Sequence, residues 1–259
     1  MKDAVTLGIA LCLTAAAMAA PTRTQAQSRL NPAQVRLGSD MGGAQPVEDN
    51  TIFTHVLLEQ AEGRWNGRNE EFRYDGQAWS GTDLNKIWLK SEGLVTNSGR
   101  FTDGQHEFLF DRAISTYFDL QAGVRVDLDQ GVTRTWGAFG IQGLSLYFFD
   151  VEATAYVSDR GRFAARLKAS YDLLITNRLI LQPEAEINLY SKSDEGRGTG
   201  SGLSDIDAGL RLRYEITRKF APYVGVSYAG RFFQSADFAR REGEAPNDVR
   251  FVFGVRSWF

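Results

Sequence analysis

Hydrophobic and polar residues alternate along most of the chain after about residue 50. In the segment 118–128 every even position is apolar, and the odd positions are Asp119, Gln121, Gly123, Arg125 and Asp127. Segments 163–173 and 206–216 repeat this pattern. Successive side chains of a strand point to opposite faces. Each segment therefore predicts a strand with one apolar face and one polar face.

The length of these runs distinguishes two classes of β-protein. Each run is about 11 residues, which is the length of a tilted transmembrane strand and roughly twice that of a typical globular strand. A soluble β-sandwich or lipocalin-like barrel explains the alternation but not the length. The polar face of these strands is also rich in Asp, Glu and Arg, so we interpret it as the lining of a polar lumen. The pattern predicts an all-β fold, a transmembrane antiparallel β-barrel.

The number of strands follows from counting similar segments. We expect about twelve, within a range of ten to fourteen, because bacterial barrels of this kind have an even number. The predicted strands begin near Phe53, Phe72, Asn85, Glu107, Phe118, Thr133, Leu146, Phe163, Leu179, Ser204, Ala221 and Arg250. The short segments 158–161 and 176–178 predict periplasmic turns, and the polar segments 191–203 and 234–248 predict outer loops.

The final nine residues, F-V-F-G-V-R-S-W-F, form one more apolar, aromatic strand. An apolar strand at this position is expected to pair with another strand, because an unpaired edge is unfavourable in lipid. We predict that it closes the barrel against the strand near Phe53. This closure places His55 at the seam.

The N-terminal residues differ from the rest of the chain. Residues 1–26 contain Lys2, an apolar run and small-residue cleavage sites, which is typical of a secretory signal peptide. Residues 27–50 lack periodicity and predict a flexible periplasmic arm. Residues 51–259 then form the outer-membrane barrel. This barrel domain has no apolar run of the ~20 residues that a transmembrane helix needs.

Composition excludes several functions. A net charge of −3 gives no basic patch for nucleic acid. The single cysteine, Cys12, lies in the predicted signal peptide, so the mature chain has no thiol chemistry. The Gly-rich run 196–202 fits neither phosphate-binding motif and predicts a loop or a strand bend. No G-x-S-x-G motif is present, so we expect no enzyme activity.

Two kinds of residue could carry chemistry. His55 and Glu59 are four apart, so both point to one face of a strand, and His106 is followed by a glutamate. Imidazole and carboxylate suit Zn²⁺ or Cu²⁺, although ordinary surface or girdle histidines are the simpler interpretation. The charged rows predict ion pairs across the lumen, with transport as the alternative role. The residues of this predicted network are Asp119, Arg125, Asp205, Asp207, Arg211, Arg213 and Glu215.

Several stretches, in order, resemble the copper resistance protein B family. The resemblance spans residues 50–259 and is carried by H-V-L-L-E-Q at 55–60, W-L-K-S-E-G at 88–93, R-A-I-S-T-Y-F-D-L-Q-A-G-V-R at 112–125, R-T-W at 134–136, V-E-A-T-A-Y-V at 151–157, G-S-G-L-S-D at 200–205, G-L-R-L-R-Y-E at 209–215 and G-V-R-S-W-F at 254–259.

This resemblance implies a non-enzymatic outer-membrane protein of Gram-negative bacteria, in contact with outer-membrane lipid. It implies a protein that binds or sequesters copper ions, or assists their passage, and that works with a periplasmic copper-binding protein or a copper oxidase. Family members usually carry a Met- and His-rich arm, where thioethers would hold Cu⁺. Here the arm contains only Met41 and no histidine. This departure favours the alternative, a structural or passive-pore barrel that has lost metal handling, whereas the resemblance over the whole barrel favours copper binding or passage.

Overall fold

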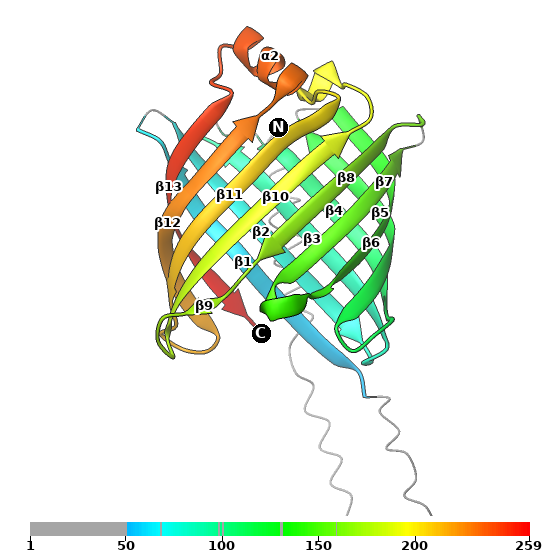
Figure 1. Ribbon diagram of the computed structural model, residues 1–259, viewed down its shortest axis with the longest axis vertical. Coiled ribbons are helices and arrows are strands. Elements are labelled where there is room, and N and C mark those ends of the chain that lie inside the picture. The colour runs from blue at the N-terminus through cyan, green and yellow to red at the C-terminus, as the bar shows by residue number, and fades with distance from the viewer. Residues whose placement is uncertain (1–50, 68, 98, 100, 130–131, 159) are drawn as a thin grey trace, which may run out of the picture.

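The protein is a closed β-barrel of twelve long antiparallel strands (Figure 1). This computed structural model describes residues 51–259 apart from 68, 98, 100, 130–131 and 159. The predicted signal peptide and arm, residues 1–26 and 27–50, lie outside the described residues. The twelve strands are β1 (Phe53–Trp65), β2 (Glu70–Gly81), β3 (Asn85–Thr96), β4 (Phe101–Ala113), β5 (Phe118–Asp129), β6 (Val132–Leu144), β7 (Asp150–Ser158), β8 (Phe163–Ser170), β10 (Leu179–Tyr190), β11 (Gly202–Tyr214), β12 (Phe220–Arg231) and β13 (Asn247–Trp258).

The barrel closes where β13 pairs with β1. Leu57 lies opposite Trp258, and the backbone amide of Val56 donates to the carbonyl of Phe259 at 3.0 Å. The prediction that the final strand pairs with the strand near Phe53 is therefore confirmed. Every other long strand pairs with its sequence neighbours, and a two-residue strand, β9 (Leu173–Leu174), pairs with β10 beside β8.

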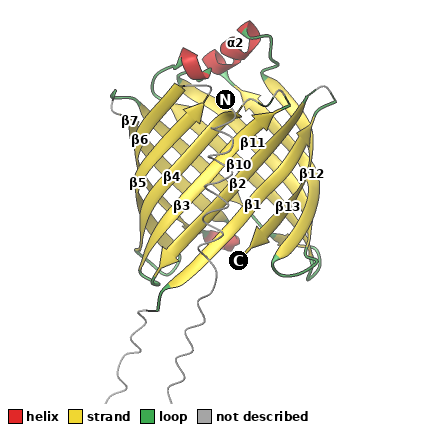
Figure 2. Cartoon of the chain, turned by 180° about the vertical axis from the view of Figure 1, so that it is seen from behind, coloured by secondary structure: helices red, strands yellow, loops and turns green. Residues whose placement is uncertain are grey.

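The two ends of the barrel differ. We call the end that holds the start of β1 and the end of β13 the terminal end. We call the opposite end the loop end, and it holds helix α2 (Phe233–Arg241) and the 3₁₀ turn η3 (Glu195–Arg197) (Figures 1 and 2). The long connections 191–201 and 232–246 both lie at the loop end. Among the described residues, no helix has the length and apolarity needed to cross a membrane.

Two sequence predictions about the connections are wrong. The turns at 158–161 and 176–178 are not at the same end, because β8 crosses the barrel between them; the first lies at the loop end with 191–201 and 232–246, and the second lies at the terminal end after the short strand β9. Leu146 does not begin a strand. Residues Leu146–Phe148 form the 3₁₀ turn η2, with Tyr147 and Phe148 at φ values of 63° and 64°, and β7 begins at Asp150.

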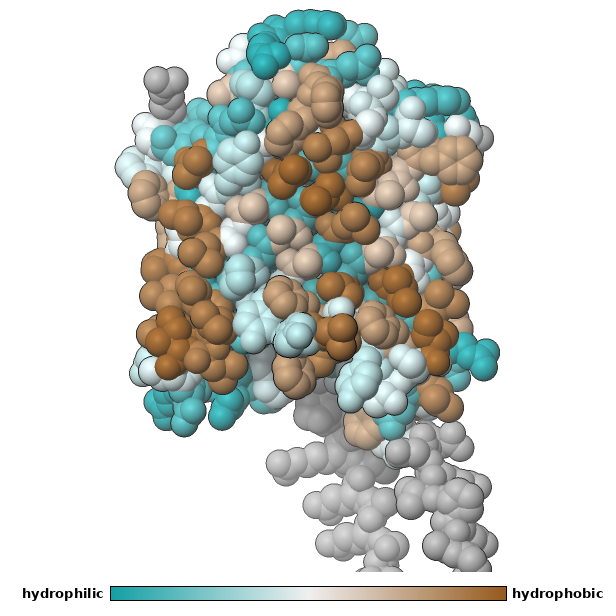
Figure 3. Space-filling view, viewed as in Figure 1, coloured by the Kyte–Doolittle hydropathy of each residue, from teal (hydrophilic) through white to brown (hydrophobic). Residues whose placement is uncertain are grey.

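Alternation sorts the side chains between lipid and lumen. The outward face carries large exposed apolar residues, such as Phe139 at 58% and Phe253 at 63% exposure. Figure 3 shows such residues over the barrel wall and hydrophilic residues around the loop end. The inward face is polar, apart from a cluster of mainly aromatic residues that includes Trp88, Trp136 and Tyr156. Apolar residues outside and polar residues inside, the reverse of a soluble protein, fit a barrel whose outer surface faces hydrocarbon.

A β-bulge in β1 shapes the lumen. The register against β2 shifts between Leu58 and Gln60, so the strict alternation breaks at that point. Glu59 lines the lumen before the bulge, and Gln60, Glu62 and Arg64 are buried in it after the bulge. The extra residue lets adjacent positions 59 and 60 both point inward, which adds a polar group to the lumen.

Candidate functional site

The candidate site is the charged lumen. Its ion pairs join strands that are not neighbours: Lys168 on β8 lies 2.9 Å from Asp75 on β2, and Arg166 on β8 lies 2.8 Å from Glu92 on β3. Beside the first of these pairs, Gln60 on β1 donates to Glu184 on β10 at 3.1 Å. These contacts place charged side chains across the interior, so the lumen is filled by polar groups at this level.

The most deeply buried cluster surrounds Glu62, whose side chain has no exposed surface. Its carboxylate accepts hydrogen bonds from Arg64 Nε at 2.7 Å, Arg211 Nε at 3.0 Å and the Tyr223 hydroxyl at 3.0 Å. Arg64 also reaches Asp207 at 3.2 Å. Two arginines thus share one buried carboxylate, which offsets the cost of removing all three charges from water.

A second cluster surrounds Asp127, which is also fully buried. Asp127 accepts hydrogen bonds from Arg125 Nε at 2.6 Å, Trp136 Nε1 at 2.8 Å and Arg197 Nη1 at 2.6 Å. The Arg125 guanidinium also lies 4.5 Å from the ring centroid of Tyr156. This cluster joins two adjacent strands of the wall to a residue of the β10–β11 connection.

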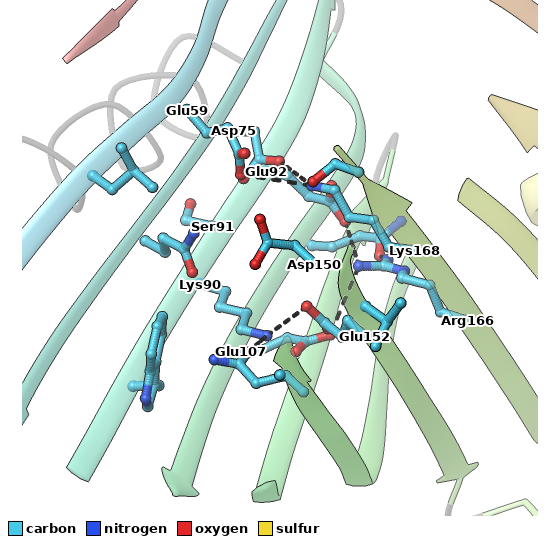
Figure 4. Close-up of a pocket in the computed structure, with 18 of the residues that line it drawn as sticks. Glu59, Asp75, Lys90, Ser91, Glu92, Glu107, Asp150, Glu152, Arg166 and Lys168 are labelled. Atoms are coloured by element: carbon cyan, nitrogen blue, oxygen red, sulfur yellow. Dashed lines mark hydrogen bonds and ion pairs between the residues drawn. The ribbon is translucent and has the colours of Figure 1, made fainter. Parts of the chain in front are cut away.

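A cavity of about 360 Å³ lies in the lumen, and its lining reaches Leu144 and Asp150 beside the terminal-end turn η2. Figure 4 shows the side chains around it. We call it the terminal cavity. Its charged lining is Glu59, Asp75, Lys90, Glu92, Glu107, Asp150, Glu152, Arg166, Lys168 and Arg256. A second cavity shares Gln142, Gly143 and Leu144 with it and extends to the terminal-end turns. The two cavities therefore adjoin each other on the terminal side of the lumen.

Most carboxylates of the terminal cavity have a basic partner. Glu152 lies 2.8 Å from Lys90, and Glu59 lies 3.8 Å from Lys168. Asp150 differs: within the part of the chain that the structure describes, no side chain donates a hydrogen bond to its carboxylate. Figure 4 shows Asp150 directed into the cavity. Asp150 has no such donor, and the Lys168 contact of Glu59 is long at 3.8 Å, so these two carboxylates are the most available to a cation.

The structure separates the predicted metal ligands. His55 lies at the seam, with its ring 6.0 Å from that of Trp79 and 5.6 Å from that of Trp258. His106 bonds to Ser91 Oγ at 2.9 Å on the outward face of β4, since its neighbour Glu107 faces the lumen. Met41 lies outside the described residues. Over residues 51–259, with the gaps given above, no group of three or more His, Cys, Asp or Glu side chains is arranged to hold a metal ion.

The residues of the predicted charge network occupy different places. Asp119 pairs with Lys86 at 2.8 Å, Asp205 accepts from Asn188 at 2.9 Å, and Arg213 pairs with Asp172 at 2.7 Å. Arg125, Asp207 and Arg211 belong to the clusters described above. Glu215 lies beyond the end of β11, where it pairs with Arg218 of the adjoining turn.

The sequence analysis missed Glu62, Arg64, Arg73 and Arg197. The first two lie in β1, where the bulge obscures the alternation that would have placed them in the lumen. Arg73 alternates correctly in β2, and it lies within 3.5 Å of Asp207 and of Glu92. Arg197 lies in the Gly-rich run, where a loop gives no periodicity from which to place a side chain.

Protonation of Asp194 is expected to loosen the β10–β11 connection. Burial alone would raise the pKa of Asp194, but hydrogen bonds from Arg134 and Arg162 outweigh burial and lower this pKa below 3.8. Because the folded pKa is lowered, the ion pairs contribute full stability above pH 3.8 and lose it as the pH falls through the lowered pKa. Hydrogen-exchange protection factors at residues 194–199 should fall over that acidic range. Asp194→Asn should show low protection at every pH, and equal profiles for both proteins would contradict the prediction.

The closed barrel, its apolar wall and its charged interior are those of an outer-membrane β-barrel protein. A solved structure of the NanC porin has the same kind of fold, with 12% identity, a TM-score of 0.53 and coverage of 79% of this chain and 99% of that chain. This likeness is one of fold alone.

The sequence comparisons define the family. The family model described as copper resistance protein B precursor matches residues 52–259. The chain is 46% identical to copper resistance protein B of Escherichia coli over 213 residues, which cover 82% of this chain and 72% of the relative. A homolog from Pseudomonas syringae pv. tomato is 45% identical with the same coverage. The chain therefore belongs to the copper resistance protein B family, and it is a copper resistance protein of the outer membrane. The family and the fold indicate a non-enzymatic role.

Proposed function

We propose that the barrel binds copper ions in the terminal cavity, and thereby sequesters them or assists their passage across the outer membrane. The observation that supports this proposal is the terminal cavity itself, with Asp150 and Glu59 in its lining on the terminal side of the lumen. In an outer-membrane barrel with short periplasmic turns, the terminal end faces the periplasm. Copper is the cargo here, and the partner on that side would be a periplasmic copper-binding protein or a copper oxidase.

The ligand chemistry favours weak, exchangeable binding of Cu²⁺. Imidazole suits copper, and carboxylates are harder ligands that bind it less selectively. His55 lies on the lumen side of β1 together with Leu57 and Glu59, both of which line the cavity. A small set of oxygen ligands with one nearby imidazole would capture an ion without retaining it. This supports loose sequestration or passage in preference to storage.

Copper binding by the refolded barrel should depend on the terminal cavity. Isothermal titration with Cu²⁺ should show binding to residues 27–259 and also to residues 51–259, since the cavity lies within the latter. The double variant Glu59→Gln/Asp150→Asn should weaken binding about tenfold or more, because it removes both available carboxylates. Glu242→Gln, at the C-terminal cap of α2, is the control. If wild type takes up no copper, the proposal is wrong.

His55→Ala is expected to weaken copper binding, and His106→Ala is its matched control. Both variants remove one imidazole from the barrel, but only His55 lies on the side of the wall that lines the cavity. The affinity for Cu²⁺ should therefore fall for the first and stay unchanged for the second. Equal losses would place the copper site elsewhere.

The alternative, a passive or structural barrel, makes a different prediction. Such a barrel would bind no copper, and a deletion strain would tolerate copper as well as its parent does. The ion pairs across the lumen argue against a wide open pore. A copper-sensitivity assay on the deletion strain, complemented with wild type or with Glu59→Gln/Asp150→Asn, separates the two functions.

A further inference from the structure

The Gly-rich connection between β10 and β11, residues 191–201, is folded onto the mouth of the barrel at the loop end (Figure 1). Its η3 turn directs Arg197 into the lumen. The Arg197 side chain is only 3% exposed and reaches the fully buried Asp127 at 2.6 Å. A loop residue thus enters the interior and bonds to the wall, which is a stronger attachment than a surface loop requires.

Two further contacts hold this connection on opposite sides. Asp194 accepts hydrogen bonds from Arg134, at the start of β6, and from Arg162, beside β8. On the other side, the Gly200 amide donates to Ser235 Oγ at 2.7 Å, and Ser201 Oγ lies 3.0 Å from Gln234 Oε1. The connection therefore spans from the β6–β8 wall to helix α2, across the mouth.

The glycines of this segment allow its backbone to turn and to approach α2 closely. Gly198 and Gly202 have φ values of 65° and 84°, which favour glycine. A Cβ atom on Gly200 would lie 2.5 Å from the backbone nitrogen of Ser235. Glycines on both sides of Arg197 leave few side chains to fix the segment by packing, so its position depends on the polar contacts described above.

We propose that residues 191–201 form a lid that closes the loop end of the lumen, with Arg197 as its latch. The lid opens when Arg197 leaves Asp127. Asp127 then keeps its bonds to Arg125 and Trp136, so the buried carboxylate stays satisfied and the wall stays intact. Release of the latch costs the contact between Arg197 and Asp127 and leaves the barrel folded. The contacts of Asp194, Gly200 and Ser201 still hold the lid at its two sides, so the loss of any one contact shifts the open–closed equilibrium toward the open form without removing the lid. This gate acts on any solute and does not rest on copper binding.

The test measures access to the lumen from outside the cell. Ser227 is 2% exposed and lies on β12 opposite Arg250 of β13, on the loop side of the Glu62 cluster. Ser227→Cys in a Cys12→Ser background supplies one thiol, because Cys12 is the only cysteine in the sequence. Intact cells are treated with a membrane-impermeant maleimide in the absence of copper, and the labelling rate is measured.

Labelling should be slow in the parent and about tenfold faster after Arg197→Ala, since the loss of one charge-assisted hydrogen bond shifts an open–closed equilibrium by roughly that factor. Asp194→Asn, which releases a different contact of the same lid, should also accelerate it. Arg240→Ala also removes one arginine charge, but from the exposed face of α2, so it should leave the labelling rate unchanged. Folding is checked by heat-dependent migration on gels. If folded Arg197→Ala and Asp194→Asn both label at the parent rate, the lid is overturned whatever the outcome of the copper titrations.

Discussion

Deletion of residues 255–259 is expected to abolish assembly of the barrel. These residues supply the strand partners of Leu57, Leu58 and Ala61 and the two backbone hydrogen bonds between Val56 and Phe259. Without them the first half of β1 has no neighbour on one side. Water is absent from the bilayer core, so each unpaired backbone group there costs several kcal/mol, and several would be exposed at once.

The measurement is the fraction of protein that reaches the outer membrane in heat-resistant, folded form. Phe259→Ala is the matched control, because it removes the aromatic ring and keeps the backbone bonds to Val56. The control should assemble to a large extent, whereas the truncated protein should remain unfolded or be degraded. Normal assembly of the truncated protein would show that closure does not require this part of the seam.

The strands were predictable because a membrane imposes a simple rule on each one separately. Alternation identified β5, β8 and β11 with correct faces, since lipid and lumen select opposite side chains at successive positions. The predicted strand 163–173 is too long, because β8 ends at Ser170 and β9 is a separate strand. The rule fails where a local irregularity intervenes. The bulge in β1 obscured Glu62 and Arg64. The apolar run at 146–149, which resembled the start of a strand, is instead a turn in which Tyr147 and Phe148 are left-handed.

The partners inside the lumen were not predictable in the same way. The pairs Lys168–Asp75 and Arg166–Glu92 join strands far apart in the sequence, and their choice depends on strand tilt and shear around the whole barrel. Arg197 meets Asp127 for the same reason. The candidate cavity also depends on this packing, because its carboxylates are distinguished by how closely a basic side chain contacts each of them.

Removal of the Glu62 carboxylate should be the most destabilising single substitution of a charged lumen residue. Glu62→Ala leaves Arg64 and Arg211 facing each other in the interior without the anion that both contact. Breaking a buried ion pair by removing one partner costs about 3–5 kcal/mol, because the remaining charge stays buried. Asp207 and Glu184 retain contacts of 3.2 Å and 3.5 Å with these arginines, so we expect the lower part of that range.

Urea unfolding in phospholipid vesicles, followed by tryptophan fluorescence, measures this loss. Glu244→Ala is the control: its pair with Arg231 has a similar length, 2.8 Å, but both side chains are about half exposed, so its loss should cost less than about 1 kcal/mol. The double variant Glu62→Ala/Arg211→Met should recover part of the stability, since it also removes one of the two buried arginine charges that Glu62→Ala leaves without their carboxylate. Equal, small losses for Glu62→Ala and Glu244→Ala would mean that the lumen cluster contributes little to stability. In that case water would replace the missing carboxylate, and the charges of the lumen would serve its solvation and its cargo instead of holding the wall together.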